Sequence, residues 1–490
     1  MRGKMDANTN NYFGIDFGTT SSATVGYMVA DGKLQRFFYG DDEGRPIPSV
    51  VAIDKETGEV YTGRAARNRR MELSESCEYI PSVKTIIDED KSIEVAGKEW
   101  TPVDIAAAMF EALKKSVKEQ TKSDMSRAVV AIPVGFSPKK REKLREAADK
   151  AGVHISSFIS EPTAAFYANY GDLKSSSVVA VFDWGGGTLD VSIIKNEGGR
   201  ISELATNGLD IAGDYIDEKI AHRVHSKIAR KKRIEVSFED MPSSDRDNML
   251  VRAELAKRNL ADDDTATISL NSYGKLGTCR ETLDYDWFAD IIEPEVDKAI
   301  ECLKKTIDQS GVGLANIDRI LLVGGSSNLR PLLDKLDKVY GDKLYFPEET
   351  MWNVSLGAAR LAMTPGGYYT NQQIGLVMSD GSFFQILKKD VPLSKCYIKC
   401  DFGMVDDTSE ARLVFSGSPD IDNSLEKYRT LEVPSYGFLQ EKIKIEAFVD
   451  ENMVFNVKAG STMRPSEFSR IWEYPYLKCY YKLPEEKTKK

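Results

Sequence analysis

The sequence SVVAVFDWGGGTLDVSIIKN, residues Ser177–Asn196, predicts a β-hairpin closed by a glycine-rich turn. The β-branched and apolar run Val178–Phe182 is typical of a buried strand, and Asp183 stands at its end. The chain then turns through three glycines and returns along Leu189–Ile194. Because glycine has no Cβ and adopts backbone angles closed to other residues, the N–H groups of such a turn can converge on an anion. The hairpin is therefore a candidate phosphate-binding element.

Two acidic residues of this hairpin indicate what else the ligand contains. Asp183 and Asp190 flank the turn residues Gly185, Gly186 and Gly187. Magnesium keeps most of its waters and takes few protein carboxylates, so hard oxygen groups beside a phosphate site suit it. We therefore expect a nucleoside triphosphate with Mg²⁺ at this turn.

The same pattern occurs near the N-terminus, in Tyr12–Val29, YFGIDFGTTSSATVGYMV. An apolar strand ends at Asp16, a second strand starts at Ala23, and the turn between them is Gly18, Thr19, Thr20 and Ser21. Two hairpins of one design, about one domain length apart, predict a duplicated α/β unit that holds phosphates between its copies. The glycine spacings of the P-loop and of the dinucleotide-binding fold do not occur in the sequence, so neither of those folds is expected.

Four segments together resemble the actin-fold ATPases, and specifically the heat shock protein 70 (DnaK-like) chaperone family. They are the hairpins IDFGTTSS and FDWGGGTLDVSI, the segment SEPTAA at Ser160–Ala165, and the strand and turn LLVGGSSN. They follow the family's order across residues 12–364. The resemblance implies an α/β actin-like (duplicated ribonuclease-H-like), two-lobed ATPase domain followed by a β-sandwich domain.

The resemblance and the composition together predict five parts of the chain. They are a flexible N-terminus at 1–11, a nucleotide-binding ATPase domain at 12–364, a linker at 365–372, a β-sandwich substrate-binding-like domain at 373–475, and a C-terminal tail at 476–490. Strand-like alternation dominates from residue 373 onward. The family's leucine-rich acidic linker is not visible, and too little chain follows the sandwich for the family's helical lid, so we expect a short form.

Composition excludes several classes of protein. The net charge of −10 argues against nucleic-acid binding, and the basic clusters Arg64–Arg70 and Lys227–Arg233 favour solvated helix faces. No stretch has the length of a membrane-spanning helix or the apolar core of a secretory signal. The six scattered cysteines suit a reducing compartment. We therefore expect a cytoplasmic monomer that binds neither nucleic acid nor membrane.

Catalytic roles come from the resemblance. Lys84, taken alone, is typical of a surface lysine whose stem covers apolar neighbours, but the family places a lysine here that reaches the γ-phosphate and the attacking water. Glu161, taken alone, is an acid that favours a helix start, and the resemblance assigns it to the magnesium and water shell. The resemblance further implies that Asp16 and Asp183 hold Mg²⁺ through water and that Thr188 lies near the γ-phosphate.

A predicted helix at Asp245–Leu260 carries candidate adenosine contacts. Glu254, Lys257 and Arg258 are spaced three and four apart, so they share one face, as in an ordinary salt-bridged surface helix. The resemblance implies instead an adenosine clamp, in which the first two contact ribose and the arginine stacks on the base.

The other side of the nucleotide is expected from two glycine turns. The resemblance assigns it to Gly213 and to the turn residues Gly324, Gly325, Ser326 and Asn328. The family's stacking arginine aligns with Asn328, and Arg330 follows two residues later. A lost cation–π contact costs about 0.5–2 kcal/mol, so we expect weakened nucleotide binding and not its abolition.

These assignments predict an ATP-dependent chaperone relative that slowly hydrolyses ATP, uses ATP/ADP and Mg²⁺, and binds extended unfolded polypeptide through its C-terminal β-domain. The resemblance also implies a J-domain co-chaperone and a nucleotide-exchange factor as partners. One alternative is a nucleotide-bound scaffold or partner-binding module with little turnover. An actin-fold sugar kinase or filament protein ranks lower, because the Glu-x-x-Lys-Arg helix and the C-terminal strands favour the chaperone branch.

Overall fold

The computed structural model describes most of the chain, and its contacts divide the chain into two compact units. Described are residues 11–38, 44–72, 76–405, 407–418, 430–437, 441–463 and 468–484, with only the backbone of 68–72. Unit 1 comprises Met1–Phe136, Lys143–Glu197 and Glu203–Thr364, and unit 2 comprises Ser137–Glu142, Gly198–Ser202 and Pro365–Lys490. The predicted flexible N-terminus, apart from residue 11, and the last six residues of the predicted tail lie outside the described residues.

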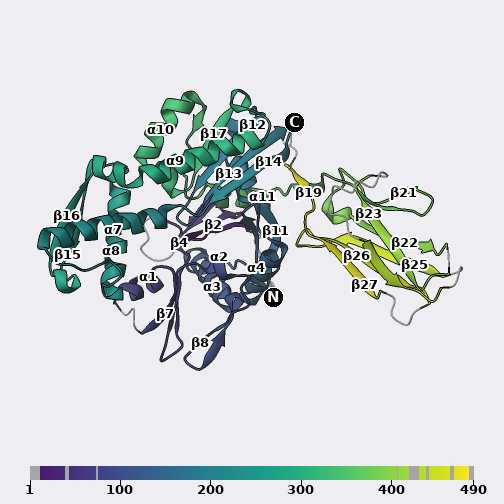
Figure 1. The fold of residues 1–490 in the computed structure, drawn as a ribbon, viewed down its shortest axis with the longest axis horizontal. Helices are drawn as coiled ribbons and strands as arrows, with labels where there is room; N and C mark the ends of the chain where they lie inside the picture. The colour runs from purple at the N-terminus through teal and green to yellow at the C-terminus, as the bar shows by residue number, and fades with distance from the viewer. Residues whose placement is uncertain are drawn as a thin grey trace, which may run out of the picture. The chain divides into compact units, whose positions relative to one another are not determined.

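Two sheets of unit 1 repeat the same strand pairing (Figure 1). In the first, β1 pairs antiparallel with β2 and parallel with β10; in the second, β12 pairs antiparallel with β13 and parallel with β17. The orders are β11-β10-β1-β2-β3, with β4 on β2, and β18-β17-β12-β13-β14. The strands are β1 Tyr12–Phe17, β2 Ser21–Met28, β3 Lys33–Phe37, β4 Ile47–Pro48, β10 Arg127–Ile132, β11 His154–Ser160, β12 Val178–Trp184, β13 Leu189–Glu197, β14 Arg200–Leu209, β17 Arg319–Val323 and β18 Leu344–Tyr345. Both predicted hairpins are confirmed, and each aspartate stands where a parallel neighbour also ends.

Smaller strands and several helices complete unit 1. The strands are β5 Val51–Asp54, β6 Val60–Thr62, β7 Cys77–Ile80, β8 Ile93–Val95, β9 Lys98–Trp100, β15 Thr265–Leu270 and β16 Cys279–Asp284. The helices are α1 Gly63–Glu72, α2 Val83–Ile86, α3 Pro102–Thr121, α4 Pro138–Lys150, α5 Glu161–Ala168, α6 Tyr170–Leu173, α7 Gly213–Lys232, α8 Ser243–Asn259, α9 Tyr285–Gln309, α10 Arg330–Tyr340 and α11 Asn353–Met363. Helix α3 begins with a reciprocal cap between Thr101 and Asp104, and Pro102 occupies its first turn, where a missing N–H costs nothing.

Tight packing fixes the elements that carry the candidate site. Helix α11 lies against β1 and α5 through small residues: a Cβ on Gly14 would lie 2.1 Å from the backbone nitrogen of Ala359, and one on Gly357 would lie 1.8 Å from the carbonyl oxygen of Ala164. No larger residue fits at either glycine without moving backbone. Around the second hairpin, a buried cluster joins β12 and β13 to α7 and α9.

Unit 2 contains two four-stranded sheets that share a buried apolar cluster. The sheet orders are β21-β20-β23-β24 and β22-β25-β26-β27. The strands are β20 Ile374–Val377, β21 Phe383–Leu387, β22 Tyr397–Gly403, β23 Glu410–Ser416, β24 Thr430–Pro434, β25 Lys442–Val449, β26 Phe455–Ser461 and β27 Arg470–Tyr474. Phe415 of the first sheet stacks on Trp472 of the second, with ring centroids 3.9 Å apart. The buried cluster takes residues from both sheets.

The structure differs from the sequence prediction in the segments assigned to linker and tail. Residues Gly367–Thr370 form β19 and Cys479–Lys482 form β28, and the two strands pair antiparallel. Strand β28 also pairs with Arg200 and Ile201. The rings of Tyr369 and Tyr480 stack at 5.4 Å, so aromatic burial and backbone pairing order both segments.

The described helices can be compared with the length and apolarity that a membrane-spanning helix needs. None of these described helices is both long enough and apolar enough to span a bilayer.

Candidate functional site

The two predicted phosphate turns face each other in unit 1. A Cβ on Gly186 would lie 2.3 Å from Oγ1 of Thr20, and one on Gly187 would lie 2.4 Å from Cγ2 of Thr19. Any side chain on either glycine would therefore displace the opposite turn. These close approaches bring together two turns that are more than 160 residues apart in the sequence, as the repeated hairpin pattern predicted.

The buried residues Lys84 and Glu161 and the half-buried aspartates Asp16, Asp183 and Asp190 lie near these turns. Lys84 Nζ donates to Glu161 Oε1 at 2.8 Å, and each of these residues is only 8% exposed. Burial, and then the charge of Glu161, raise the pKa of Asp16 to about 7 and that of Asp183 well above its usual range. The same two causes raise the pKa of Asp190 to about 6. Lys84 lowers the pKa of each aspartate, but by less than burial and Glu161 raise it.

The same carboxylates keep Lys84 protonated. Burial by itself lowers the pKa of Lys84, but the carboxylates of Glu161 and Asp16 outweigh that effect and raise it. Lys84 therefore stays a cation in this buried place. The sequence alone favoured a surface lysine, which the 8% exposure of Lys84 contradicts, and its role at the γ-phosphate stays a prediction.

The donor set fits a hydrated magnesium ion and not one bound directly by many side chains. Among the described residues, no three His, Cys, Asp or Glu side chains lie close enough together to ligate a metal. Yet the pKa values of Asp16 and Asp183 are raised, and a nearby cation would stabilise the ionised form of both carboxylates. Magnesium that keeps its waters would meet both conditions.

Hydrogen bonds within the second hairpin stabilise its glycine turn. The N–H of Gly185 donates to the carbonyl oxygen of Thr188 at 3.0 Å, which closes the hairpin. The Thr188 hydroxyl donates to Asp190 Oδ2 at 2.7 Å. Thr188, expected near the γ-phosphate, is thus oriented by the acidic residue at the start of β13.

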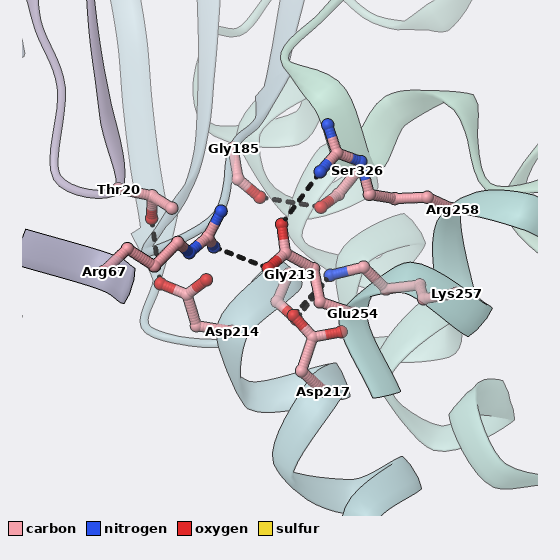
Figure 2. A network of polar contacts seen from close by, with 10 residues as sticks. All are labelled: Thr20, Arg67, Gly185, Gly213, Asp214, Asp217, Glu254, Lys257, Arg258 and Ser326. Atoms are coloured by element: carbon pink, nitrogen blue, oxygen red, sulfur yellow. Dashed lines mark hydrogen bonds and ion pairs between the residues drawn. The ribbon is translucent and has the colours of Figure 1, made fainter. Parts of the chain in front are cut away.

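Residues at the start of α7 and in the turn after β17 donate hydrogen bonds to the glycine turn of the second hairpin (Figure 2). The N–H groups of Gly213 and Asp214 donate to the carbonyls of Gly185 (3.2 Å) and Gly186 (2.7 Å). Ser326 Oγ also donates to the Gly185 carbonyl, at 2.7 Å. Gly213 and Ser326, both predicted site residues, therefore meet at the second glycine turn.

Asp214 is a residue of this site that the sequence analysis missed. The hydroxyl of Thr20, in the first turn, donates to Asp214 Oδ2 at 2.9 Å (Figure 2). The two residues are 194 positions apart in the sequence, so no local pattern indicates the contact. The sequence signal that could have indicated Asp214 is its place directly after Gly213, at the start of α7.

The three predicted adenosine-contacting residues lie together on α8, but all have protein partners (Figure 2). Lys257 Nζ donates to the Gly213 carbonyl and to Asp217 Oδ2, both at 2.8 Å. Glu254 forms ion pairs with Arg258 (3.2 Å) and with Arg67 of α1 (2.5 Å). Arg67 belongs to the basic cluster that the sequence assigned to a solvated helix face, and it instead contacts the candidate site.

Asn328, which aligns with the family's stacking arginine, and the nearby Arg330 both have protein partners. Asn328 lies in the 3₁₀ turn Gly325–Asn328, and its Nδ2 donates to Thr350 Oγ1 at 3.2 Å. The guanidinium of Arg330 lies 4.1 Å from the ring centroid of Tyr285 and forms an ion pair with Asp264 at 3.0 Å. Arg330 therefore already has an aromatic and an acidic partner.

Gly324 lies directly beside Asp183, just after the end of β17. Its φ of +83° is open to glycine, and a Cβ there would lie 2.6 Å from Asp183 Oδ1. The register pairs Asp183 with Val323, the residue before this glycine. Glycine is thus required at this turn both by backbone conformation and by space.

Comparison with known proteins agrees with this geometry. The family model described as Hsp70 protein matches residues 12–377, which is more than half of the chain. Two relatives, the proteins named "Chaperone protein DnaK" from two strains of Halobacterium salinarum, are each 26% identical over 471 residues, covering 91% of this chain and 72% of theirs. The chain therefore belongs to the Hsp70 family, a family of ATP-dependent chaperones with an actin-like ATPase fold.

Proposed function

We propose that this protein is a chaperone that binds and slowly hydrolyses ATP in unit 1 and binds extended polypeptide through unit 2. One observation carries the ATPase part: two opposed glycine turns lie beside the buried Lys84–Glu161 pair and the aspartates Asp16 and Asp183. Phosphoryl transfer depends mainly on positioning and on stabilising negative charge, and this arrangement supplies both.

In this proposal the turns bind the phosphates and the buried groups orient the attacking water. Asp16 and Asp183 would hold a hydrated Mg²⁺, which when bound offsets phosphate charge. Lys84 presents its ammonium to the γ-phosphate, and Glu161 holds that ammonium in place and accepts a hydrogen bond from water. The phosphate-binding residues are Gly18, Thr19, Thr20, Ser21, Gly185, Gly186, Gly187 and Thr188. No strong general base accompanies them in the proposal, so turnover should be slow.

Adenosine would be bound between α8 and the turn after β17, through Gly213, Glu254, Lys257, Arg258, Gly324, Gly325, Ser326 and Asn328. Binding at Glu254 competes with its ion pairs to Arg67 and Arg258. Partly exposed pairs of this kind contribute about 0.2–1 kcal/mol each, so their loss lowers nucleotide affinity only modestly.

Unit 2 supplies the proposed polypeptide-binding part, which we take to be the family's β-sandwich at 373–475. Strand β22 ends the order β22-β25-β26-β27, and its residue Tyr397 is 60% exposed. An extended peptide can add to such an edge through backbone hydrogen bonds, with side-chain pockets giving selectivity. A J-domain co-chaperone and a nucleotide-exchange factor are the proposed partners of a cytoplasmic monomer.

A nucleotide-bound scaffold with little turnover is the second candidate. The pairing of β19 with β28 favours it, because it orders the predicted linker in a ladder that the family pattern does not anticipate. The family match over residues 12–377 gives no support to a sugar kinase or a filament protein.

The decisive variant is Lys84→Ala. We expect it to bind ADP within about threefold of the parent by calorimetry and to lose at least about 100-fold in steady-state phosphate release. Lys335→Ala is a matched control, because Lys335 also pairs with two acids but stands on the surface of α10. Unchanged turnover in Lys84→Ala would contradict the assigned role, and tight nucleotide binding without turnover in the parent would favour the scaffold.

A further inference from the structure

A carboxylate on β14 contacts the cap of the helix that carries Glu161. The hydroxyl of Ser160 donates to Glu203 Oε1, and the Thr163 hydroxyl donates to the same oxygen at 3.2 Å. Ser160 is the N-cap residue of α5, where its Oγ accepts from the N–H of Thr163. One carboxylate oxygen of Glu203 therefore fixes both hydroxyls of this first turn.

The surroundings of Glu203 make this an expensive place for a carboxylate. Ser160 is 6% exposed and Thr163 is 1% exposed, so the hydrogen bonds lie where water is scarce. Burial raises the pKa of Glu203, and the hydrogen bonds from Ser160 and Thr163 oppose that rise. Glu203 itself is half-buried, and within the described residues it takes part in no ion pair with lysine, arginine or histidine of the kind that balances the buried acids Asp217, Glu281 and Glu295. Stability alone is therefore a weak reason for an acid at this position.

The helix cap determines where Glu161 points. Glu161 directly follows Ser160 and is the first residue of α5, and its carboxylate holds Lys84 at 2.8 Å. The far end of α5 is fixed separately, because Asn169 donates to Asn353 Oδ1 at 3.0 Å. With that end held, the cap is the part of α5 whose freedom would move Glu161.

We infer that Glu203 is a positioning residue, which holds the Ser160 cap and thereby sets the orientation of Glu161 toward Lys84. The inference rests on the proposed ATPase function. It deepens that function by extending the site to a β14 residue that no motif indicates. A displacement of a catalytic group by about 1 Å can cost about 100-fold in rate, so a cap that holds Glu161 has a large potential effect.

The test compares Glu203→Ala with Glu203→Gln. We expect Glu203→Ala to lower the single-turnover hydrolysis rate at least about tenfold while ADP affinity stays within about twofold. Glutamine keeps an acceptor oxygen for both hydroxyls, so Glu203→Gln should restore most of the rate. Ser160→Ala should reproduce the loss, and the double variant Ser160→Ala with Glu203→Ala should be no slower than either single variant, because both act through one contact.

Glu281→Ala is the matched control for lost stability. Glu281 is a buried acid of β16 that pairs with Lys227 and Lys231 of α7. Its removal should lower the unfolding temperature without changing the hydrolysis rate measured well below that temperature. An equal rate loss in Glu281→Ala and Glu203→Ala, or no loss in Glu203→Ala, would overturn the inference.

Hydrogen exchange separates a failure of this inference from a failure of the proposed function. In Glu203→Ala, amides of the peptide spanning residues 158–168 should exchange at least about fivefold faster than in the parent, because the cap bond at Thr163 is weakened. Absence of hydrolysis by the parent would refute the proposed function, and the exchange result would still decide the inference. Unchanged exchange in this peptide would overturn the positioning role by itself.

Discussion

Unit 1 gathers acidic side chains around a lysine, whereas the two sheets of unit 2 meet through apolar and aromatic side chains. Asp16, Glu161 and Asp183 lie near Lys84, and the pKa values of both aspartates rise because of burial and then the charge of Glu161. The buried cluster shared by the sheets of unit 2 is apolar, with Phe415 stacked on Trp472. Natural proteins accept unfavourable local interactions mainly where function needs them. The contrast supports the proposal that ATP hydrolysis belongs to unit 1, while the sheets of unit 2 are held together by packing.

The largest expected effect tests the packing side of this contrast. Trp472 is 6% exposed and contacts the rings of Phe415, Phe455 and Tyr474. Trp472→Ala should lower the free energy of unfolding of unit 2 by about 3–5 kcal/mol, because it leaves a large cavity. Urea denaturation followed by near-ultraviolet circular dichroism measures the loss. Ile471→Ala, at a 57% exposed neighbouring position, is the control and should change little. A loss below about 1 kcal/mol in Trp472→Ala would show that the stacked cluster does not hold the sheets.

The next effect tests the charge imbalance of unit 1 through its pH dependence. The pKa of Asp16 is about 7 in the folded protein, above its ordinary value, because of burial and then the charge of Glu161. The folded state therefore binds this proton more tightly, and the added stability present at low pH is lost as pH rises through about 7. From pH 8 to pH 6 the nucleotide-free protein should gain about 1.4 kcal/mol from Asp16.

Calorimetric unfolding across this pH range measures the gain. Asp16→Asn should remove most of it, and bound Mg·ADP should reduce it because a cation replaces the proton as the partner of the carboxylate. Asp104→Asn is the control and should leave this gain unchanged. Burial raises the pKa of Asp104 less than hydrogen bonds from Lys150 and Thr101 lower it, so Asp104 does not titrate between pH 6 and pH 8. An equal pH slope in the parent and in Asp16→Asn would remove Asp16 as the source.

The smallest effect concerns the paired strands β19 and β28. Tyr480 lies between the ring of Tyr369 and the guanidinium of Arg200, which is 3.7 Å from its ring centroid. Tyr480→Leu keeps apolar volume but loses both contacts, so we expect a loss of about 1 kcal/mol. Limited proteolysis between residues 365 and 372 should become faster. Tyr397→Leu, at a 60% exposed position, is the control. Unchanged proteolysis in Tyr480→Leu would show that backbone pairing alone orders these segments.

The sequence was informative wherever a feature depends on neighbouring residues. Both hairpins, the capped helix α3 and the strands β21–β26 carry local signals: glycines at a turn, a threonine cap followed by proline, or alternating apolar residues. The resemblance then supplied the roles of Lys84 and Glu161, whose buried pairing the structure shows. Glycine-rich turns are informative because few other residues fit their backbone and their space.

The contacts that the sequence did not predict depend on partners that are distant in the chain. Arg67 meets Glu254 across 187 positions, and Asp214 meets Thr20 across 194. Strand β28 is four residues long and lies beyond every recognised motif, so its pairing with β19 has no local signal. Burial of such short segments is decided by tertiary contacts, which outweigh intrinsic preferences.

The most direct test of the central claim is single-turnover conversion of ATP to ADP by the full chain, with Mg²⁺ and with EDTA. ATP at substoichiometric concentration would be mixed with excess protein and the products separated over time. The arrangement of the two turns, Lys84 and the buried acids predicts slow, complete conversion with Mg²⁺ and none with EDTA. Bound ATP that remains intact with Mg²⁺ would contradict it and would leave a protein that uses nucleotide only as a structural ligand.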